Sequence, residues 1–319
     1  MNNFDYFSDL RKNFEAYYNE KLWPKLFELE KERLRQLYRF WILVLIMCIG
    51  LPCFIVKMWG EWIYLVFTER NLHNIEAIVR LGLLLVAIII VVVGYPAISY
   101  KNAVKFSVIN DFINFFGRFR HRCAKHLSDD LIKKSLLINP YNRHSGDDYF
   151  EGTYKDVGMV ISEEEMRFKR SKGSSNVFKG IIILLNFPKS FKGQTVVFKD
   201  WGLFNIFHKP SYKFEHIKFE DINFEEKFEV YGTDQIEARY LLTTSFMERM
   251  LMVRDAFKGK KIQFSFFENQ LLIAIESSIN MFEPASLFRR STNRHSINIV
   301  LEQFISIFNV VEFLKLTQQ

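Results

Sequence analysis

Residues 40–56 read FWILVLIMCIGLPCFIV and residues 81–100 read LGLLLVAIIIVVVGYPAISY, and neither stretch contains a charged residue. A helix rises 1.5 Å per residue, so the second stretch would be about 30 Å long, the thickness of the hydrocarbon core of a bilayer. The first stretch is shorter, and Trp41 and Trp59 lie near its ends, where interfacial tryptophans are common. A helix in a soluble core usually keeps a polar stripe, which both stretches lack. We therefore predict a hairpin of two transmembrane helices over residues 40–100.

The Lys and Arg residues around these two spans are unevenly distributed. Six lie just before the first span and four soon after the second, whereas three lie between them (Lys57, Arg70 and Arg80). Basic residues favour the cytoplasmic side of a membrane. We therefore predict a multi-pass protein of the bacterial inner membrane, with both termini in the cytoplasm and residues 58–79 as an outer loop. The 39 residues before the first span are too long and too charged for the start of a cleaved signal peptide.

Residues 1–39 and 101–139 are predicted to be helical cytoplasmic extensions of the two spans. Apolar residues recur in both at spacings of three or four, and after the second span this pattern continues to Cys123. Pro24 interrupts the first extension, which predicts two amphipathic helices, the second running into the first span. We expect the two extensions to pack side by side as a stalk. Self-association of the chain through this stalk, as a coiled coil, is the alternative.

The texture of the sequence changes after Asn139-Pro140, where short β-rich runs replace the long helical patterns. We expect strands at 157–161, 167–169, 176–187, 195–199, 216–220, 224–232, 261–267 and 271–276, the last two forming a hairpin around Glu268-Asn269. Helices are expected at 234–241, 245–257 and 295–316. Because strands and helices do not alternate as βαβ units, residues 140–319 are predicted to form a cytosolic α+β domain with an antiparallel sheet.

The composition excludes several classes of function. Three cysteines, two of them inside the first span, cannot form a disulfide framework. The net charge of +7 is modest and no aromatic-basic motif accompanies it, so we expect no nucleic-acid partner. The densest basic segment is expected to contact anionic lipid, provided that the helix carrying it bends toward the bilayer; it comprises Arg118, Arg120, Arg122 and Lys125.

Residues 228–250, FEVYGTDQIEARYLLTTSFMERM, resemble the signature of a bacterial membrane-protein family known only as domain of unknown function 3137. Further similar segments are Glu151-Gly152-x-Tyr154, Phe178-Lys179-Gly180, Gly193-x-Thr195-Val196 and Phe282-Glu283-Pro284, so the resemblance is expected to cover nearly the whole chain. Thr244 departs from the family, which commonly has proline after the threonine; we expect a softer start to the following helix. The resemblance implies no known activity, ligand or catalytic residue.

Four polar residues gather at one strand-to-helix junction within this segment: Asp234, Glu237, Arg239 and Tyr240. Asp234 and Glu237 have the spacing of a capping box, in which each side chain bonds the other residue's backbone amide, and a structural role accounts for them. The functional alternative is that all four line a polar pocket that binds a peptide or a lipid headgroup.

Neither a metal site nor a catalytic centre is predicted. His121, Cys123 and His126 are close in sequence, but on a helix the two histidines would point about 140° apart. Glu163, Glu164 and Glu165 would alternate across a strand and are expected at a solvated edge. The sequence also lacks HExxH, paired CxxC, Walker and GxSxG motifs, so we predict no cofactor. We expect a membrane-anchored binding or scaffolding module, with a membrane-tethered enzyme acting near residues 234–240 as the alternative.

Overall fold

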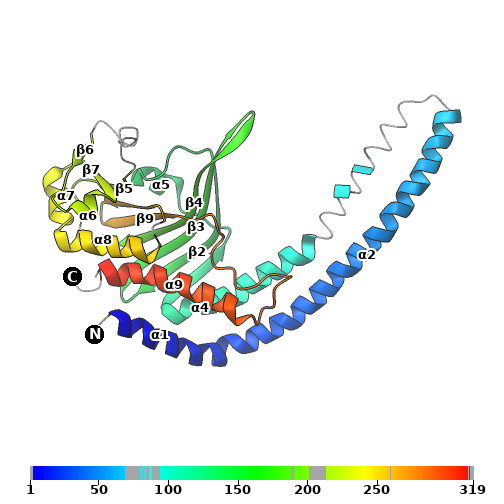
Figure 1. The fold of residues 1–319 in the computed structure, drawn as a ribbon, viewed down its shortest axis with the longest axis horizontal. Coiled ribbons are helices and arrows are strands. Elements are labelled where there is room, and N and C mark those ends of the chain that lie inside the picture. The colour runs from blue at the N-terminus through cyan, green and yellow to red at the C-terminus, as the bar shows by residue number, and fades with distance from the viewer. Residues whose placement is uncertain are drawn as a thin grey trace. The chain divides into compact units, whose positions relative to one another are not determined.

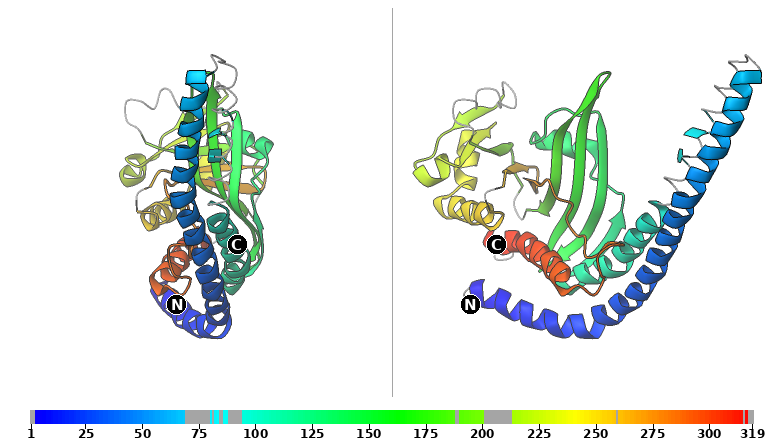
Figure 2. Two further views of the ribbon diagram at one scale, coloured as in Figure 1. Left: turned by 90° about the vertical axis from the view of Figure 1, so that its right-hand side faces the viewer. Right: turned by 45° about the vertical axis from the view of Figure 1, so that its right-hand side comes forward.

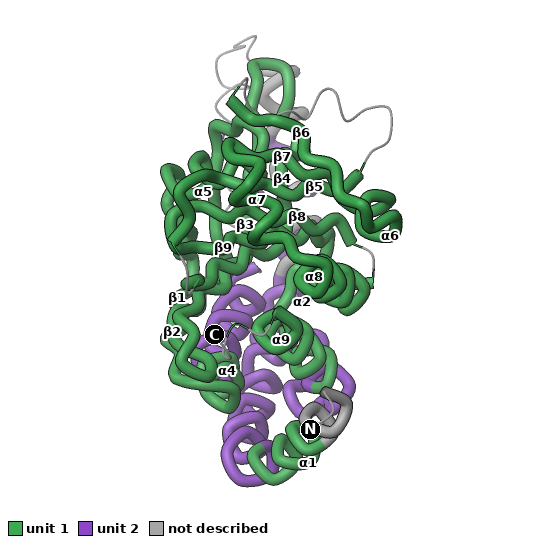
Figure 3. The backbone as a smooth tube through the Cα atoms, turned by 90° about the vertical axis from the view of Figure 1, so that its left-hand side faces the viewer, with its two compact units in different colours: residues 1–17, 109–283, 298–319 green, residues 18–108, 284–297 purple. Residues whose placement is uncertain are grey.

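The computed structural model describes residues 3–68, 80, 82–83, 86–87, 94–187, 190–200, 213–258, 260–314 and 316. The chain divides into two compact units (Figure 3). The first, which we call the sheet unit, comprises residues 1–17, 109–283 and 298–319. The second, the helical unit, comprises residues 18–108 and 284–297.

The sheet unit contains an antiparallel sheet in the order β1-β2-β3-β4-β9-β8-β5-β7-β6, which confirms the predicted α+β class (Figure 1). The strands are β1 Arg118–Cys123, β2 Arg143–Tyr154, β3 Val157–Arg170, β4 Gly173–Asn186, β5 Thr195–Lys199, β6 Glu215–Ile217, β7 Phe228–Gly232, β8 Ile262–Phe267 and β9 Gln270–Glu276. The predicted hairpin is confirmed as β8 and β9. Glu268 adopts a φ of 56° in its tight turn, the left-handed conformation that two-residue hairpin loops require.

Helices cover both faces of this sheet (Figure 1). The helices of the sheet unit are α1 Asn3–Tyr17, α4 Asn110–Phe116, α5 Asp129–Ser135, α6 Ile222–Glu225, α7 Gln235–Leu241, α8 Thr244–Ala256 and α9 Arg294–Leu314. Helices α7, α8 and α9 begin and end within two residues of the helices predicted at 234–241, 245–257 and 295–316. The predicted buried face of the last helix is also confirmed, because Ile297, Leu301, Phe304, Phe308 and Val311 are all buried.

Phenylalanine rings form the core between α9 and the sheet. The Phe304 ring stacks on Phe282 with centroids 4.5 Å apart and lies edge-on to Phe150 of β2 at 5.5 Å. The Phe308 ring stacks on Phe116 of α4 at 4.6 Å. Tyr149, next to Phe150 in β2, belongs to a separate core with Ile132 of α5. Neighbouring residues of a strand point to opposite faces, so the sheet is buried on both.

The helical stalk predicted over residues 101–139 is wrong from Arg118 onward. Helix α4 ends at Phe116, and residues 118–123 form the edge strand β1. This segment, RFRHRC, alternates exposed arginines with Phe119 and His121, which is a period of two. The expected packing of the two extensions is seen between α1 and α4, where the Phe14 and Phe112 rings lie 5.1 Å apart and the Tyr17 hydroxyl donates to the Asp111 carbonyl at 3.0 Å.

The helical unit is built around α2, Trp23–Thr68, which follows a π-helical turn at Tyr18–Leu22. Figure 2 shows α2 as one unbroken helix, which confirms the prediction that a second helix starts near Pro24 and continues through residues 40–56. Glu30 and Arg33 fasten residues 284–297 to it: Arg33 donates to Glu30 and to the Leu287 carbonyl, and Glu30 accepts from the Ser291 amide at 2.9 Å. Partial burial raises the pKa of Glu30, but the hydrogen bonds from Arg33 and Ser291 outweigh it and hold the pKa below its usual value.

Among the described residues, one helix, α9, is long and apolar enough to cross a membrane. Its apolar stretch is 56% buried, and its phenylalanines form the core described above, which is the behaviour of a core helix. The first predicted span lies inside α2, where its apolar side chains project outward; those more than half exposed are Trp41, Leu45, Ile46, Ile49 and Val56. The second predicted span lies mostly outside the described residues, so they do not show a two-span hairpin.

Candidate functional site

The family-like segment borders a pocket of about 340 Å³ in the sheet unit. The pocket lies between the connection from β4 to β5 and the helices α7 and α8. Its described lining is Phe187, Ser190, Phe191, Glu237, Tyr240, Leu241, Thr243, Ser245, Phe246 and Arg249. Of the four polar residues predicted to meet here, Glu237 and Tyr240 line the pocket and Asp234 and Arg239 do not.

Asp234 is the N-cap of α7, as its position in the sequence predicts. Its Oδ1 accepts hydrogen bonds from the amides of Ile236 at 2.9 Å and Glu237 at 3.0 Å. These amides belong to the first turn of the helix and have no acceptor within it. The carboxylate of Asp234 therefore serves the helix end.

Glu237 departs from the predicted capping box, because its carboxylate bonds the β4–β5 connection. Oε1 accepts from the amide of Lys192 at 2.7 Å and Oε2 accepts from the amide of Gly193. A Cβ atom on Gly193 would lie 2.7 Å from Thr233 Oγ1 and 3.0 Å from Glu237 Oε2, so the family-like glycine permits this close approach. Glu237 therefore fixes one wall of the pocket to the other.

The other two predicted residues, Arg239 and Tyr240, have exposed side chains on α7. The Arg239 guanidinium lies over the Phe219 ring, 5.5 Å from its centroid, which is the geometry of a cation–π contact. Tyr240 is 73% exposed, and Ile236, one turn earlier on the same face, is 83% exposed. Together Ile236 and Tyr240 form an exposed apolar patch beside the pocket.

Sequence analysis missed the contribution of α8. Arg249 projects into the pocket from this helix and, within the described part of the chain, forms no ion pair. Thr243 caps the helix by accepting from the Phe246 amide at 3.3 Å, and Ser245 adds a second hydroxyl. The apolar wall consists of Phe187, Phe191 and Phe246, of which the first two have ring centroids 5.1 Å apart.

This lining favours binding over acid–base chemistry. General acid–base catalysis needs a side chain that is free to exchange a proton with a substrate. Glu237 is the one carboxylate of the described lining, and its two oxygens are occupied by the amides of Lys192 and Gly193. The remaining groups, a guanidinium, hydroxyls and phenyl rings, suit an apolar group next to a hydrogen-bond acceptor.

The three arginines of the predicted basic segment lie on strand β1 rather than on a helix, and Lys125 lies just after the strand. Arg118, Arg120 and Arg122 are all exposed and, being two residues apart, share one face of this edge strand. Lys125 lies 3.7 Å from the centroid of the Tyr149 ring and 3.8 Å from the carboxylate of Glu151. Charges on an edge strand also discourage pairing with another chain, which is a structural explanation for the arginines.

A histidine joins two carboxylates near α5. Nδ1 of His144 lies 2.6 Å from Oδ1 of Asp129, and Nε2 lies 2.6 Å from Oε2 of Glu164. Oε1 of Glu164 accepts from the Leu127 amide at 2.8 Å. Burial lowers the pKa of His144, but its hydrogen bonds to Glu164 and Asp129 outweigh burial and raise the pKa above its usual value. The solvated edge expected for residues 163–165 is wrong, because Glu163 and Glu164 are buried.

Within the described residues, three groups have donor atoms close enough to hold a metal ion: His121 with Cys123 and Asp148, His126 with His144 and Glu164, and Asp147 with Asp148 and Glu163. The helical geometry that argued against a metal at residues 121–126 does not apply, because His121 and Cys123 lie on strand β1. In the second group both ring nitrogens of His144 already lie within hydrogen-bonding distance of carboxylates, those of Asp129 and Glu164.

Part of the chain matches a family model to which no activity is assigned. A family model described as "Protein of unknown function (DUF3137)" matches residues 176–316, which agrees with the resemblance of residues 228–250 but covers less of the chain than expected. No curated protein matches the sequence. The crystal structure of the mycobacterial trehalose monomycolate transport factor A, TtfA, is similar with 12% sequence identity and a TM-score of 0.35, over 61% of this chain and 88% of that chain. This structural likeness is too weak to support an inference.

Proposed function

We propose that this chain is a membrane-anchored binding module whose sheet unit captures a segment of a partner protein in the pocket at α7 and α8. The observation that carries this proposal is the pocket lining, in which Arg249 and hydroxyl groups stand beside three phenyl rings. The exposed pair Ile236 and Tyr240 extends the apolar surface beyond the pocket. Exposed aromatic and aliphatic side chains next to a pocket are typical of protein-binding surfaces.

The anchor is the predicted pair of spans. An uncharged stretch of α2 that projects Trp41, Leu45 and Val56 outward would be costly in water, and a bilayer removes this cost. Residues 81–100 supply the second span by their length and lack of charge. The flanking Lys and Arg residues support an inner-membrane location with the sheet unit in the cytoplasm.

The proposed ligand is a peptide segment that carries one apolar side chain and one carboxylate. The apolar side chain would fill the space against Phe187, Phe191 and Phe246, and the carboxylate would pair with the Arg249 guanidinium. The predicted alternative, an enzyme acting near residues 234–240, has less support, because Asp234 and Glu237 are held by backbone amides.

Site-specific photo-crosslinking in cells tests this function. A photoreactive phenylalanine analogue replaces Tyr240 at the pocket, and in a control chain it replaces Met252, which is 51% exposed on α8 and outside the pocket lining. We expect a discrete protein adduct from position 240 that Arg249→Gln weakens at least tenfold and Glu248→Gln leaves unchanged. Equal adducts from positions 240 and 252, or adducts insensitive to Arg249→Gln, would contradict the proposal.

A further inference from the structure

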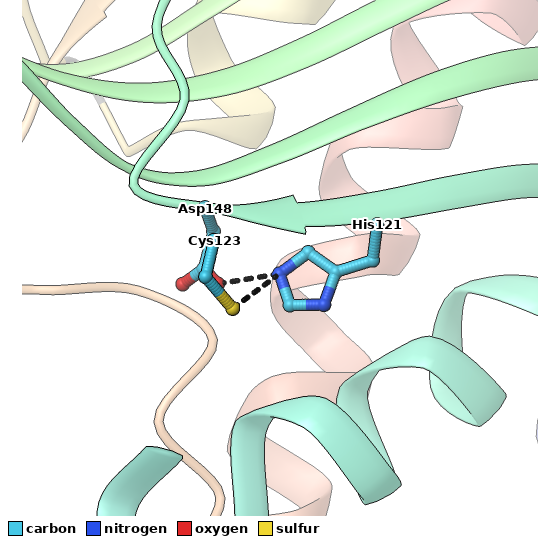
Figure 4. Close-up of side chains that lie close together, drawn as sticks. All are labelled: His121, Cys123 and Asp148. Atoms are coloured by element: carbon cyan, nitrogen blue, oxygen red, sulfur yellow. Dashed lines mark hydrogen bonds and ion pairs between the residues drawn. The ribbon is translucent and has the colours of Figure 1, made fainter.

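Three donor side chains of different chemistry share one face of the sheet at β1 and β2. His121 and Cys123 are two residues apart on β1, so their side chains point to the same side. Asp148 is paired directly opposite Cys123 in the register of β1 and β2, which places it on that side too. Figure 4 shows the carboxylate and the thiol side by side, both facing the ring of His121.

The carboxylate of Asp148 and the thiol of Cys123 both lie close to one nitrogen of His121. Nε2 of His121 lies 2.7 Å from Oδ1 of Asp148 and 3.9 Å from Sγ of Cys123, and the donor atoms all lie within 4.8 Å of one another. Ligands of a tetrahedral zinc ion are about 3.3–3.6 Å apart, given zinc bonds of about 2.0–2.3 Å. The distance from His121 Nε2 to Asp148 Oδ1 would have to lengthen by about 0.6 Å, and the distance from Nε2 to Cys123 Sγ would have to shorten by about 0.4 Å.

The same convergence excludes a cysteine–histidine–aspartate relay. In such a relay the carboxylate bonds Nδ1 of the histidine, so that Nε2 is free to take the proton of the nucleophile. Here Asp148 and Cys123 both face Nε2 of His121. The arrangement fits donors around a shared cation better than groups that pass a proton along.

The site is also held in place, accessible to ions and close to further carboxylates. The side chain of His121 is 2% exposed, and its ring stacks on Phe150 with centroids 4.7 Å apart and an angle of 18° between the planes. Asp148 is fully buried, whereas Cys123 is exposed and offers a path for an ion to enter. Carboxylate oxygens of Asp147 and Glu163 lie within 4.8 Å of one on Asp148. A cation bound by Asp148 would therefore lie close to these two further carboxylates.

We propose that His121 Nε2, Cys123 Sγ and the Asp148 carboxylate form a binding site for a zinc ion, with the fourth position open to water or to a neighbouring carboxylate. Imidazole, thiolate and carboxylate are the ligand types that zinc takes in proteins. Cys123 binds as the thiolate, and its proton passes to solvent when the metal enters. Phe150 holds the imidazole ring in place, as packing does for ligands at established metal sites.

Cobalt(II) titration of the purified full-length protein in detergent tests the site. Cys48 and Cys53 are first replaced by serine, so that Cys123 is the one remaining thiol. A thiolate bound to cobalt gives an intense near-ultraviolet charge-transfer band, which imidazole and carboxylate ligands do not give. We expect this band to saturate at one equivalent of cobalt and to disappear when zinc is added.

Matched variants distinguish cobalt binding at this site from cobalt binding at other histidines. We expect Cys123→Ser to abolish the charge-transfer band, and His121→Gln to weaken cobalt binding at least tenfold. His126→Gln removes a histidine from the group formed with His144 and Glu164, and it should change neither the charge-transfer band nor the affinity for cobalt. Thermal melting in the presence of a chelator checks that each variant folds, and Cys123→Ser is decisive because this exposed side chain barely changes shape. A cobalt complex without a thiolate band, or a band that survives Cys123→Ser, would overturn the proposal.

Discussion

The carboxylate of Asp234 accepts a hydrogen bond from the amide of Glu237 at 3.0 Å, whereas the carboxylate of Glu237 turns away and binds the backbone of residues 192 and 193. Two acidic residues of one motif therefore have different tasks. Asp234 stabilises the start of α7, and Glu237 ties α7 to the β4–β5 connection across 44 residues of sequence. Substitutions at the two positions should consequently have different effects.

Asp234→Asn should be nearly neutral for stability, and Asp234→Ala should lower the free energy of unfolding by about 0.5–2 kcal/mol. Asparagine keeps an oxygen that can accept from the amides of Ile236 and Glu237, and alanine does not. Thermal or urea unfolding of the full-length protein measures both variants. If Asp234→Asn were fully stable but had lost crosslinking at position 240, the carboxylate would have a role beyond the cap.

Glu237→Gln should lower the free energy of unfolding by about 1 kcal/mol and reduce ligand capture in the pocket. The amide offers one oxygen where the carboxylate offered two, so the hydrogen bond from either Lys192 or Gly193 is lost. Hydrogen exchange at residues 190–194 should rise in this variant. Glu248→Gln, an exposed change on α8, is the control and should leave exchange there unaltered.

Much of the fold could be predicted where a local pattern agrees with the tertiary structure. The hairpin of β8 and β9, strand β5 and helices α7 to α9 follow from alternation, turn residues and helical periodicity. Strand β1 was mistaken for helix because Phe116, Phe119 and Cys123 also fit a spacing of three or four. Pairing with β2, 25 to 35 residues later, decides between the two structures, and a local pattern does not contain that information.

The candidate site was predictable only in its local part. The cap by Asp234 depends on neighbouring residues, so the spacing of the motif identifies it. The hydrogen bonds between Glu237 and the Lys192 amide, and between His144 and Glu164, join segments that only the folded sheet brings together. Glu164 was expected in solvent for the same reason. A strand pattern does not reveal that a histidine 20 residues earlier, His144, hydrogen-bonds the buried carboxylate of Glu164.

The stability of the sheet unit should fall as the pH rises above about 6.5, the ordinary histidine pKa, because folding raises the pKa of His144 and so favours its charged form. A pKa raised on folding stabilises the protein below the ordinary histidine pKa, and this stabilisation disappears as the pH rises through the folded value. Asp129 and Glu164 face the ring as acceptors, and His126 and Tyr141 pack against it.

Melting curves recorded in the presence of a chelator measure this dependence without interference from bound metal. His144→Gln should flatten the curve of melting temperature against pH. His295→Gln changes an exposed histidine of α9 and should leave the curve as it is in the parent protein. An identical slope in His144→Gln and the parent protein would mean that another group titrates.

A reporter that is active only in the cytoplasm should function when fused after Gln319, and a reporter that is active only outside should function when inserted at His73. This outcome follows from the excess of Lys and Arg before the first span and after the second. Replacing Lys101 and Lys105 with Gln weakens that asymmetry and should reduce the cytoplasmic fraction at the C-terminus. Equal signals from both reporters at Gln319 would argue against the two-span arrangement.

Thr244→Pro should raise the free energy of unfolding by about 0.4–1 kcal/mol. Thr244 is the first residue of α8, where proline costs no intrahelical hydrogen bond and its fixed φ suits the helix. The preceding residue, Thr243, has φ −65° and ψ 158°, the extended conformation that a following proline requires. The gain therefore comes from the smaller conformational freedom of the unfolded chain.

Two neighbouring substitutions show whether this explanation is right. Thr244→Ala removes the threonine side chain without fixing the backbone, so it should fall short of the gain from proline. Ser245→Pro places the ring one position later, where it would force Thr244 out of the helical region, and this variant should be less stable than the parent protein. If both proline variants shifted the melting temperature in the same direction, the start of α8 would lie elsewhere than at Thr244, and the cap by Thr243 would be wrong as well.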